Sequence, residues 1–241
     1  MTTAVFITAR LDSTRLPGKM LKPINSIPVI EHVINRAINV HATKVVLCTT
    51  DRKCDDKLEE IGKESNIIVF RGSLDRIQRW ADACISLNVD KFVNFDADDL
   101  FASPELMNLS LIMLDCLPNV DYICSPNQMV CGAFTYAFRK SEIIRIADSY
   151  NGYYKHEWQT FDAFCNPTFI LSQRHSLYYG NERLTLDYIE DLNFFRSVFK
   201  NIPDVWRCNL SYILKYLRQN PDLCKINQFR QEDFLKNQER V

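Results

Sequence analysis

The sequence predicts an α/β protein built on a mostly parallel sheet, and three observations carry this prediction. Short β-rich runs alternate with longer segments of helical periodicity over the first hundred residues, which is the pattern of βαβ units. Hydrophobic residues make up 46% of the 241 residues and charged residues 24%, so a sizeable core is possible. No Pro/Gly-rich linker or internal repeat divides the chain. We therefore expect residues 1–241 to form a single domain.

The expected elements of the first hundred residues follow one another as strand, loop and helix. Strands are expected at residues 4–8, 44–49, 67–70 and 91–95, and helices at 28–40, 51–65 and 75–87. Pro28 suits the start of the first helix, and Asp51 is a candidate cap for the second. Parallel strands end at one edge of a sheet, so the loops that follow them gather where ligands bind in open α/β folds. These loops span residues 10–19, 49–51, 71–75 and 96–99.

From about residue 121 to residue 170 the pattern becomes irregular and rich in aromatic residues. Such an insertion can close over a substrate or form a subunit interface, and its rings can equally fill a mixed β core. Beyond it, a short strand is expected at 184–186 and helices at 189–199, 211–218 and 231–236. Residues 209–241 are thus expected to form a C-terminal helical tail.

Charge, hydropathy and cysteine content exclude several classes of protein. Lys plus Arg number 29 and Asp plus Glu 30, a net charge of −1, which argues against a nucleic-acid partner. No apolar run reaches the roughly 18 residues of a membrane span, and no basic-then-apolar leader begins the chain. We therefore expect a cytoplasmic protein with no membrane partner. The nine cysteines form no CxxC pair, which favours free thiols over disulfides or structural zinc.

The most informative segment is the loop 8–19, which reads Thr-Ala-Arg-Leu-Asp-Ser-Thr-Arg-Leu-Pro-Gly-Lys. It combines three cations, Arg10, Arg15 and Lys19, with two hydroxyl groups and a Pro-Gly turn. Such a loop surrounds a polyphosphate with backbone amides and fixed positive charge. It is neither a Walker A loop nor a dinucleotide fingerprint, since GxxxxGK[ST] and GxGxxG are both absent. The alternative is a solvated cationic loop.

Carboxylates follow two of the expected strands. The cluster Asp96-Ala-Asp-Asp99 ends the strand at 91–95, and Asp187 follows the one at 184–186. Carboxylates from different strand ends, facing a cationic phosphate loop, predict a Mg²⁺ site, because Mg²⁺ prefers one or two carboxylates together with phosphate oxygens. The alternative is that these aspartates cap helices.

These motifs resemble those of the cytidylyltransferases that make CMP-activated sugar acids. That family includes SpsF-like proteins of spore-coat polysaccharide biosynthesis and the CMP-Kdo and CMP-acylneuraminate synthetases. The resemblance rests first on Ala9-Arg10 and on Ser13-Thr-Arg-Leu-Pro-Gly-Lys-Met-Leu-Lys-Pro23. It continues through segments 48–51, 70–73 and 184–192, and through Asn220-Pro-Asp and Lys225-Ile-Asn227 in the tail.

The resemblance implies a Rossmann-like, GT-A-like nucleotidyltransferase domain that binds CTP with Mg²⁺ as its cofactor. Such an enzyme transfers CMP to a small sugar-type acceptor, a nonulosonic or Kdo-like sugar acid, and releases pyrophosphate. Such enzymes serve surface polysaccharide biosynthesis and are often homodimers. The resemblance therefore implies a homodimer whose interface is formed by residues 121–170. No Ser, Cys or His nucleophile is implied, because metal ions can activate the acceptor hydroxyl and align it for attack.

The resemblance also assigns roles to individual residues. The implied catalytic set is Lys19, Arg10, Asp98 and Asp187. Lys19 would stabilise charge on the transferring phosphate, while Asp98 and Asp187 would hold Mg²⁺. The implied nucleotide-binding set is Ala9, Arg10, Ser13, Arg15, Lys19, Thr50, Asp51, Arg71 and Asp96.

Departures from the family pattern concern the phosphate loop and the acceptor. Asp12 stands where the family has a small residue and should weaken anion binding unless Arg10 or Arg15 pairs with it. The middle region matches poorly, which predicts a rebuilt, more apolar acceptor pocket. Three alternatives stay open: a non-catalytic nucleotide-binding subunit, a glycosyltransferase, and transfer to a phosphorylated sugar or alcohol. In the last case the candidate phosphate ligands are Arg139, Lys140, Lys155 and Arg174.

Overall fold

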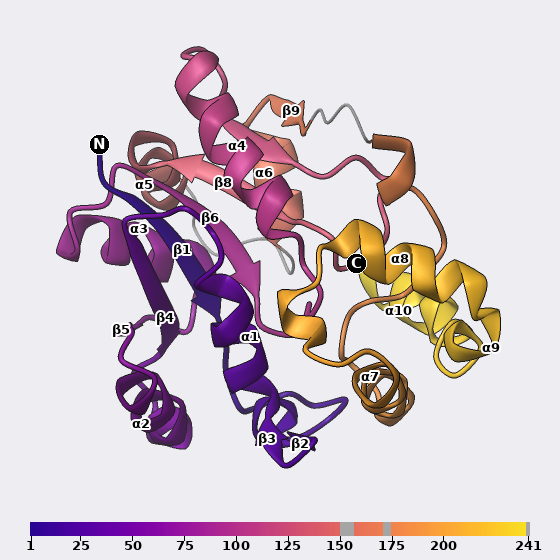
Figure 1. Ribbon diagram of the computed structural model, residues 1–241. Helices are drawn as coiled ribbons and strands as arrows, with labels where there is room; N and C mark the ends of the chain where they lie inside the picture. The colour runs from indigo at the N-terminus through magenta and orange to yellow at the C-terminus, as the bar shows by residue number, and fades with distance from the viewer. Residues whose placement is uncertain (150–156, 171–174, 240–241) are drawn as a thin grey trace.

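The computed structural model describes residues 1–149, 157–170 and 175–239. Within them a seven-stranded sheet has the order β5-β4-β1-β6-β8-β7-β9 (Figure 1). The strands are β1 Thr3–Thr8, β4 Lys44–Thr50, β5 Ile68–Gly72, β6 Lys91–Asp96, β7 Tyr122–Cys124, β8 Tyr136–Arg139 and β9 Pro167–Phe169. β5, β4, β1 and β6 run parallel, whereas β8 pairs antiparallel with both β6 and β7. This mixed, mostly parallel sheet confirms the predicted fold class.

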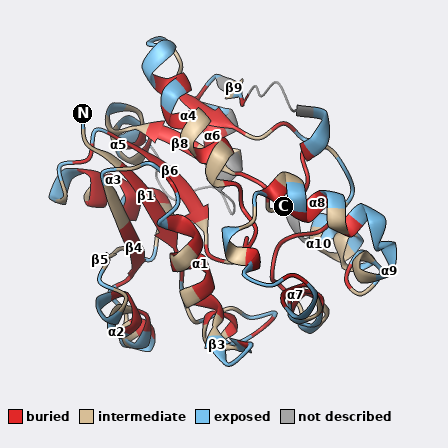
Figure 2. Ribbon diagram, viewed as in Figure 1, coloured by how far each residue is buried: buried red, intermediate tan, exposed pale blue. Residues whose placement is uncertain are grey.

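Helices cover both faces of the sheet, and each face has its own apolar core. The helices are α1 Val29–Ala37, α2 Asp56–Glu64, α3 Arg76–Ser86, α4 Pro104–Cys116, α5 Lys140–Ser149, α6 Glu157–Phe164, α7 Ile189–Asn201, α8 Leu210–Gln219, α9 Pro221–Cys224 and α10 Arg230–Glu239. Val5 and Ile7 of β1 belong to one core, and Ala4 and Phe6 belong to the other, as the alternation of side chains along a strand requires. Figure 2 shows the buried strands between helices whose outer surfaces are exposed.

The strands and helices predicted for the first hundred residues are present, with one difference at Asp51. Its backbone amide donates to the carbonyl of Gly72 and thus extends the pairing of β4 with β5. A 3₁₀ turn, Lys53–Asp55, then intervenes before α2 begins at Asp56. The aspartate that does cap a helix as predicted is Asp75, whose carboxylate accepts from the amide of Gln78 at the start of α3.

The strand predicted at 184–186 is wrong. The amide of Leu184 donates to the carbonyl of Cys131, and the amide of Leu186 donates to that of Asp98. The segment therefore crosses between two loops and has no continuous partner along which to form a strand. Its hydrogen bonds nevertheless bring Asp187 to the end of β6, which is where the sequence placed it.

The aromatic-rich segment 121–170 adds β7, β8 and β9 to the sheet. Tyr122 and Phe138 stack with ring centroids 5.1 Å apart, and Phe161 lies 4.9 Å from Phe138. These rings fill the core under α3 and α5, as the mixed-core interpretation predicted. Tyr150, Tyr153 and Tyr154 lie outside the described residues, and the roles of the segment as a lid or dimer interface stay predictions.

Three further findings bear on the expectations from composition. All nine cysteines are free. The helices α8, α9 and α10 occupy the expected C-terminal tail and gather beside α7 (Figure 1). None of the described helices combines the length and the apolar character of a membrane span.

Candidate active site

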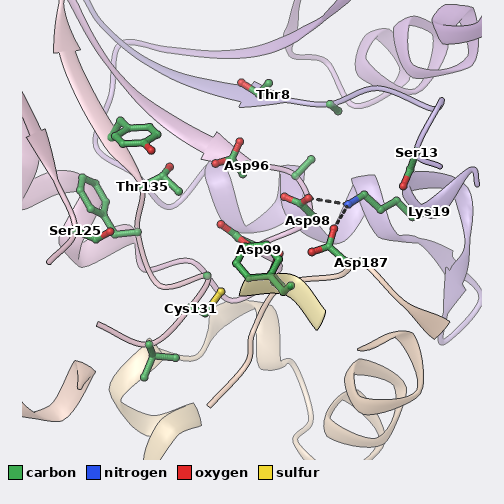
Figure 3. A pocket seen from close by; sticks show the side chains of 18 of the residues that line it. Thr8, Ser13, Lys19, Asp96, Asp98, Asp99, Ser125, Cys131, Thr135 and Asp187 are labelled. Carbon is green, nitrogen blue, oxygen red and sulfur yellow. Dashed lines mark hydrogen bonds and ion pairs between the residues drawn. The ribbon is translucent and has the colours of Figure 1, made fainter. Parts of the chain in front are cut away.

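A cavity of about 1320 Å³ opens at the carboxyl ends of β1 and β6 (Figure 3). Its walls come from the loop after β1, the start of α3, the turn after β6, and the segments 125–136, 180–187 and 228–235. Sites for a single small ligand are usually about 300–1000 Å³. This cavity therefore has room for two substrates at once.

Lys19 lies at the centre of one end of this cavity. Its Nζ donates to Asp98 Oδ2 at 2.7 Å, to the carbonyl of Leu186 at 2.8 Å and to Asp187 Oδ1 at 3.1 Å (Figure 3). Gly18, just before it, has a φ of 64°, a left-handed conformation that glycine adopts without steric cost. The Pro-Gly turn thus directs Lys19 inward, and the predicted loop and strand-end carboxylates meet there.

The charges in this cluster stabilise one another. Burial lowers the pKa of Lys19, but the facing carboxylates of Asp98 and Asp187 outweigh it and raise that pKa above its usual value. Burial likewise raises the pKa of Asp98, but the charge and hydrogen bond of Lys19 hold that pKa below its usual value. Burial and the neighbouring aspartates raise the pKa of Asp99 well above the usual range. The cluster therefore holds a charged lysine between two carboxylates.

Asp187 is fixed by three cations and by a second aspartate. Arg15 Nη2 lies 2.6 Å from Asp187 Oδ1, and the buried Arg183 donates to Asp187 Oδ2 at 3.1 Å. Arg183 also binds Asp191, whose carboxylate accepts from the backbone amide of Asp187 at 2.8 Å. Sequence reasoning missed Arg183 and Asp191. The available signal was their spacing, since residues 183, 187 and 191 are four apart around the start of α7.

Asp98 and Asp187 fit the requirements of a Mg²⁺ ion. Both carboxylates lie within 3.1 Å of Lys19 Nζ. A metal cation near that position would therefore be close to both carboxylates. Among the described residues no group of three or more His, Cys, Asp or Glu side chains is arranged to hold a metal. Mg²⁺ commonly takes only one or two carboxylates and completes its shell with phosphate oxygens and water, so the pair is sufficient.

Asp12 is neutralised inside the phosphate loop. Arg10 Nε lies 3.3 Å from Asp12 Oδ1, and Arg52 Nη2 lies 2.8 Å from Asp12 Oδ2. Burial raises the pKa of Asp12, but the hydrogen bond from Arg52 and the charge of Arg10 outweigh it and lower that pKa. Ala9, Arg10, Ser13 and Arg15 line the cavity. The sequence analysis expected Asp12 to weaken anion binding unless Arg10 or Arg15 pairs with it. Arg10 does pair with Asp12, and Arg52 is a second partner.

Three residues expected around the nucleotide lie outside the cavity lining. Thr50 is fully buried and donates to Asp55, while Asp51 is exposed. Arg71 pairs with Asp56 and Glu59 and donates to the carbonyls of Thr50 and Arg52. These side chains brace the turn between β4 and α2. Beside this turn the cavity is lined by Asp96, Arg76 and Arg79. Arg76 Nη1 lies 3.0 Å from Asp96 Oδ1.

The other end of the cavity is neutral and partly apolar. Its wall includes Ser125, Asn127, Phe134, Thr135, Tyr136, Asn181, Gln231, Phe234 and Leu235. The charged side chain among the described residues of this wall is Glu182, which pairs with Arg218 at 2.7 Å. Arg139 donates to the carbonyls of Leu114 and Leu117, and neither it nor Lys140 lines the cavity. Lys155 and Arg174 lie outside the described residues.

Comparison with known proteins agrees with this arrangement. A family model described as Cytidylyltransferase matches residues 4–240. The spore coat polysaccharide biosynthesis protein SpsF of Bacillus subtilis (strain 168) is 26% identical over 226 residues, 90% of this chain and 94% of that protein. The 3-deoxy-manno-octulosonate cytidylyltransferase of Trichlorobacter lovleyi is 23% identical over 202 residues, 78% of this chain and 79% of that protein.

A solved structure shares the fold over nearly the whole chain. It is a cytidylyltransferase from Leptospira borgpetersenii serovar Hardjo-bovis, with a TM-score of 0.81 and 23% sequence identity, and the match covers 93% of this chain and 97% of that one. The family match spans the phosphate loop, both carboxylates and the tail. The chain therefore belongs to the cytidylyltransferase family and is a nucleotidyltransferase.

Proposed function

We propose that this enzyme transfers CMP from CTP to a sugar acid and releases pyrophosphate, in the biosynthesis of a surface polysaccharide. The observation that carries the proposal is the meeting of Lys19, Asp98 and Asp187 at one end of a cavity with room for two substrates. The names of the two relatives, one a sugar-acid cytidylyltransferase and one a polysaccharide biosynthesis protein, support the acceptor class.

In this proposal the chain binds the triphosphate and stabilises the charge that develops on it. Arg10, Ser13 and Arg15 surround the phosphates, and Lys19 lies beside the α-phosphate, where the phosphoryl oxygens gain negative charge. Asp98 and Asp187 would hold Mg²⁺, which would supply Lewis-acid polarisation of the phosphate oxygens. Arg183 and Asp191 keep Asp187 oriented. The neutral end of the cavity places the acceptor hydroxyl in line with the departing pyrophosphate.

The first test is a thermal-shift titration with CTP, UTP, ATP and GTP, each with and without Mg²⁺. A ligand at 100 times its dissociation constant adds about 2.7 kcal/mol, which raises the melting temperature of a protein this size by several degrees. We expect the largest, Mg²⁺-enhanced shift with CTP, followed by pyrophosphate release when a sugar acid is added. The absence of a shift with every nucleotide would contradict the proposal. A larger shift with another nucleotide would mean that the enzyme transfers that nucleotide's monophosphate instead of CMP.

A further inference from the structure

A run of hydrogen-bonded polar side chains crosses the interior of the protein from α3 to the neutral end of the cavity. Trp80 Nε1 donates to Thr8 Oγ1 at 3.0 Å, Thr8 Oγ1 lies 2.7 Å from Asn94 Oδ1, and Asn94 Nδ2 lies 3.0 Å from Thr135 Oγ1. Trp80 and Asn94 are fully buried and Thr8 is nearly so. We call these four side chains the Trp80–Thr135 relay. It ends at the cavity wall, of which Thr135 is part.

The direction of the first hydrogen bond in the relay is fixed by its donor. An indole N–H can only donate, so Thr8 accepts from Trp80. In the structure Thr8 then donates to Asn94 Oδ1. The amide group of Asn94 accordingly has Nδ2 toward Thr135, an orientation that the NMR experiment below checks because distances alone do not assign it. Thr135 consequently accepts from Asn94 and keeps its own proton for another partner.

Among the described residues, the hydroxyl proton of Thr135 has a poor hydrogen-bond partner. The carbonyl oxygen of Asn94 is 3.5 Å from Thr135 Oγ1, whereas O–H···O hydrogen bonds are usually about 2.5–3.0 Å long. Figure 3 shows Thr135 and Ser125 on the side of the cavity away from Lys19. An oxygen of a molecule bound there, at normal hydrogen-bond distance, is a better acceptor than the Asn94 carbonyl.

We propose that Thr135 is a specificity-determining residue that donates its hydroxyl proton to an oxygen of the acceptor substrate. The relay holds the hydroxyl as a donor, so it binds an oxygen that offers a lone pair, and the carboxylate of a sugar acid is the strongest such acceptor in the molecule. This inference rests on the proposed function and deepens it, because it specifies which group of the acceptor the neutral wall recognises. Among the described residues of that wall, the donors are neutral hydroxyl and amide groups, and the carboxylate of Glu182 is paired with Arg218.

The kinetic test compares Thr135→Val with Thr135→Ser. The probe is whichever of 3-deoxy-manno-octulosonate and N-acetylneuraminate gives faster pyrophosphate release with the wild-type enzyme. Val keeps the size of the side chain and removes the donor, so we expect the acceptor KM to rise about 10-fold or more while the KM for CTP changes less than 2-fold. Ser keeps the donor and should restore the acceptor KM to within about 3-fold of wild type. An unchanged acceptor KM in Thr135→Val would overturn the proposal.

A second variant tests the relay rather than the hydroxyl itself. In Asn94→Asp both carboxylate oxygens accept, so the Thr135 proton turns from the cavity toward residue 94. We expect the same rise in acceptor KM as in Thr135→Val, and a double variant no worse than either single one. If Asn94→Asp fails to fold, the comparison of Val with Ser at position 135 still decides the role of the donor.

The polarity of the relay is measurable without any substrate. In protein labelled with ¹⁵N at asparagine, Thr135→Val should shift the side-chain NH₂ signals of Asn94, while Thr8→Val should leave them nearly unchanged. The reverse pattern would show that Nδ2 faces Thr8 and would overturn the relay. Wild-type protein that shows the CTP shift but turns over neither sugar acid would overturn the sugar-acid part of the proposed function, and the NMR result would then decide the relay alone.

Discussion

The two ends of the cavity differ in the kinds of side chain that line them. We call the end with Lys19 the nucleotide end and the end with Thr135 the acceptor end, after the proposed function. At the nucleotide end, Arg15, Lys19 and Arg183 interlock with Asp98 and Asp187 at distances of 2.6 to 3.1 Å. At the acceptor end, the described wall carries hydroxyl and amide groups beside the rings of Phe134 and Phe234. In the proposed function, one end therefore stabilises charge, and the other distinguishes shapes and hydrogen-bonding groups.

This difference follows from what each end does. Phosphoryl transfer needs fixed charges where the phosphate oxygens become more negative, whatever the acceptor. Those charges come from a short loop, the turn after β6 and the segment that ends at Asp187, so few substitutions preserve them. The acceptor end is assembled from segments 125–136 and 180–182 and from α10, and it can be rebuilt without disturbing the transfer chemistry.

The largest expected effect is that of Lys19→Met at the nucleotide end. Loss of the ammonium group beside the transferring phosphate should lower kcat at least about 10³-fold. Lys19 is also buried, with only 8% of its surface exposed. Its loss removes the buried cation that Asp98 and Asp187 share and leaves Asp98 without the ion pair that faces it, so the free energy of unfolding should fall by about 3–5 kcal/mol. Pyrophosphate release and urea unfolding measure the two effects.

Arg10→Met is the matched control, because Arg10 belongs to the same loop but its side chain is 54% exposed. We expect its unfolding free energy to change by less than about 0.5 kcal/mol. Mg²⁺ should also raise the melting temperature of Lys19→Met more than that of the wild type, since the two carboxylates then lack the cation that they share. Turnover at the wild-type rate in Lys19→Met would refute the role of this end in charge stabilisation.

Asp98→Asn and Asp187→Asn should have the next largest effects. Each removes a carboxylate from the proposed Mg²⁺ pair, so each should lower kcat about 10²- to 10³-fold and raise the Mg²⁺ concentration needed for half-maximal activity. The double variant should be little worse than either single one, because the two residues act as a unit. Mild and additive losses would instead mean that both aspartates serve the local structure.

Sequence reasoning predicted that Lys19, Asp98 and Asp187 come together, because the signals for these residues are local. Lys19 follows a Pro-Gly turn and Asp98 follows a strand, so fold class and motif together place them. Thr50 and Arg71 were expected there from the resemblance, yet they brace the turn after β4, because a position matched along the chain does not fix where its side chain points. The roles of Arg183 and Asp191 depend on how the 184–186 segment crosses two loops, which no periodicity shows.

The acceptor end was predicted only as more apolar than usual. Its wall includes α10, more than forty residues after Asp187 in the sequence. The pattern of residues 231–236 predicted the helix correctly but carried no information about where it docks. That position depends on tertiary contacts, namely the hydrogen bond from Arg183 Nη1 to Gln231 Oε1 at 3.2 Å and the stacking of Arg183 on Phe234.

Phe234→Ala tests whether α10 belongs to the acceptor end. Phe234 lines the cavity, so its truncation should raise the acceptor KM about 10-fold and leave the KM for CTP unchanged. The control is Phe229→Ala, since Phe229 is 57% exposed and lies outside the cavity lining. Steady-state kinetics with each substrate varied in turn measure the effect. A rise in the KM for CTP alone would assign α10 to the nucleotide end.

The smallest expected effect is that of Asp12→Asn, which changes the charge of the nucleotide end without changing its shape. Asp12 offsets part of the positive charge of Arg10 and Arg52. Asparagine removes the negative charge, so CTP should bind about 2- to 5-fold more tightly at low ionic strength. The gain should fade at about 1 M salt, where the Debye length is about 3 Å. Calorimetric titration of CTP at both salt concentrations measures it.

Weaker CTP binding by Asp12→Asn would contradict this prediction. It would mean that the carboxylate contributes by orienting Arg10 and Arg52 more than it costs by its charge. The nucleotide end would then depend on geometry as much as on net charge, as the acceptor end does. Because an orienting role survives high salt whereas a purely Coulombic one fades, the salt dependence separates the two contributions within the same titration.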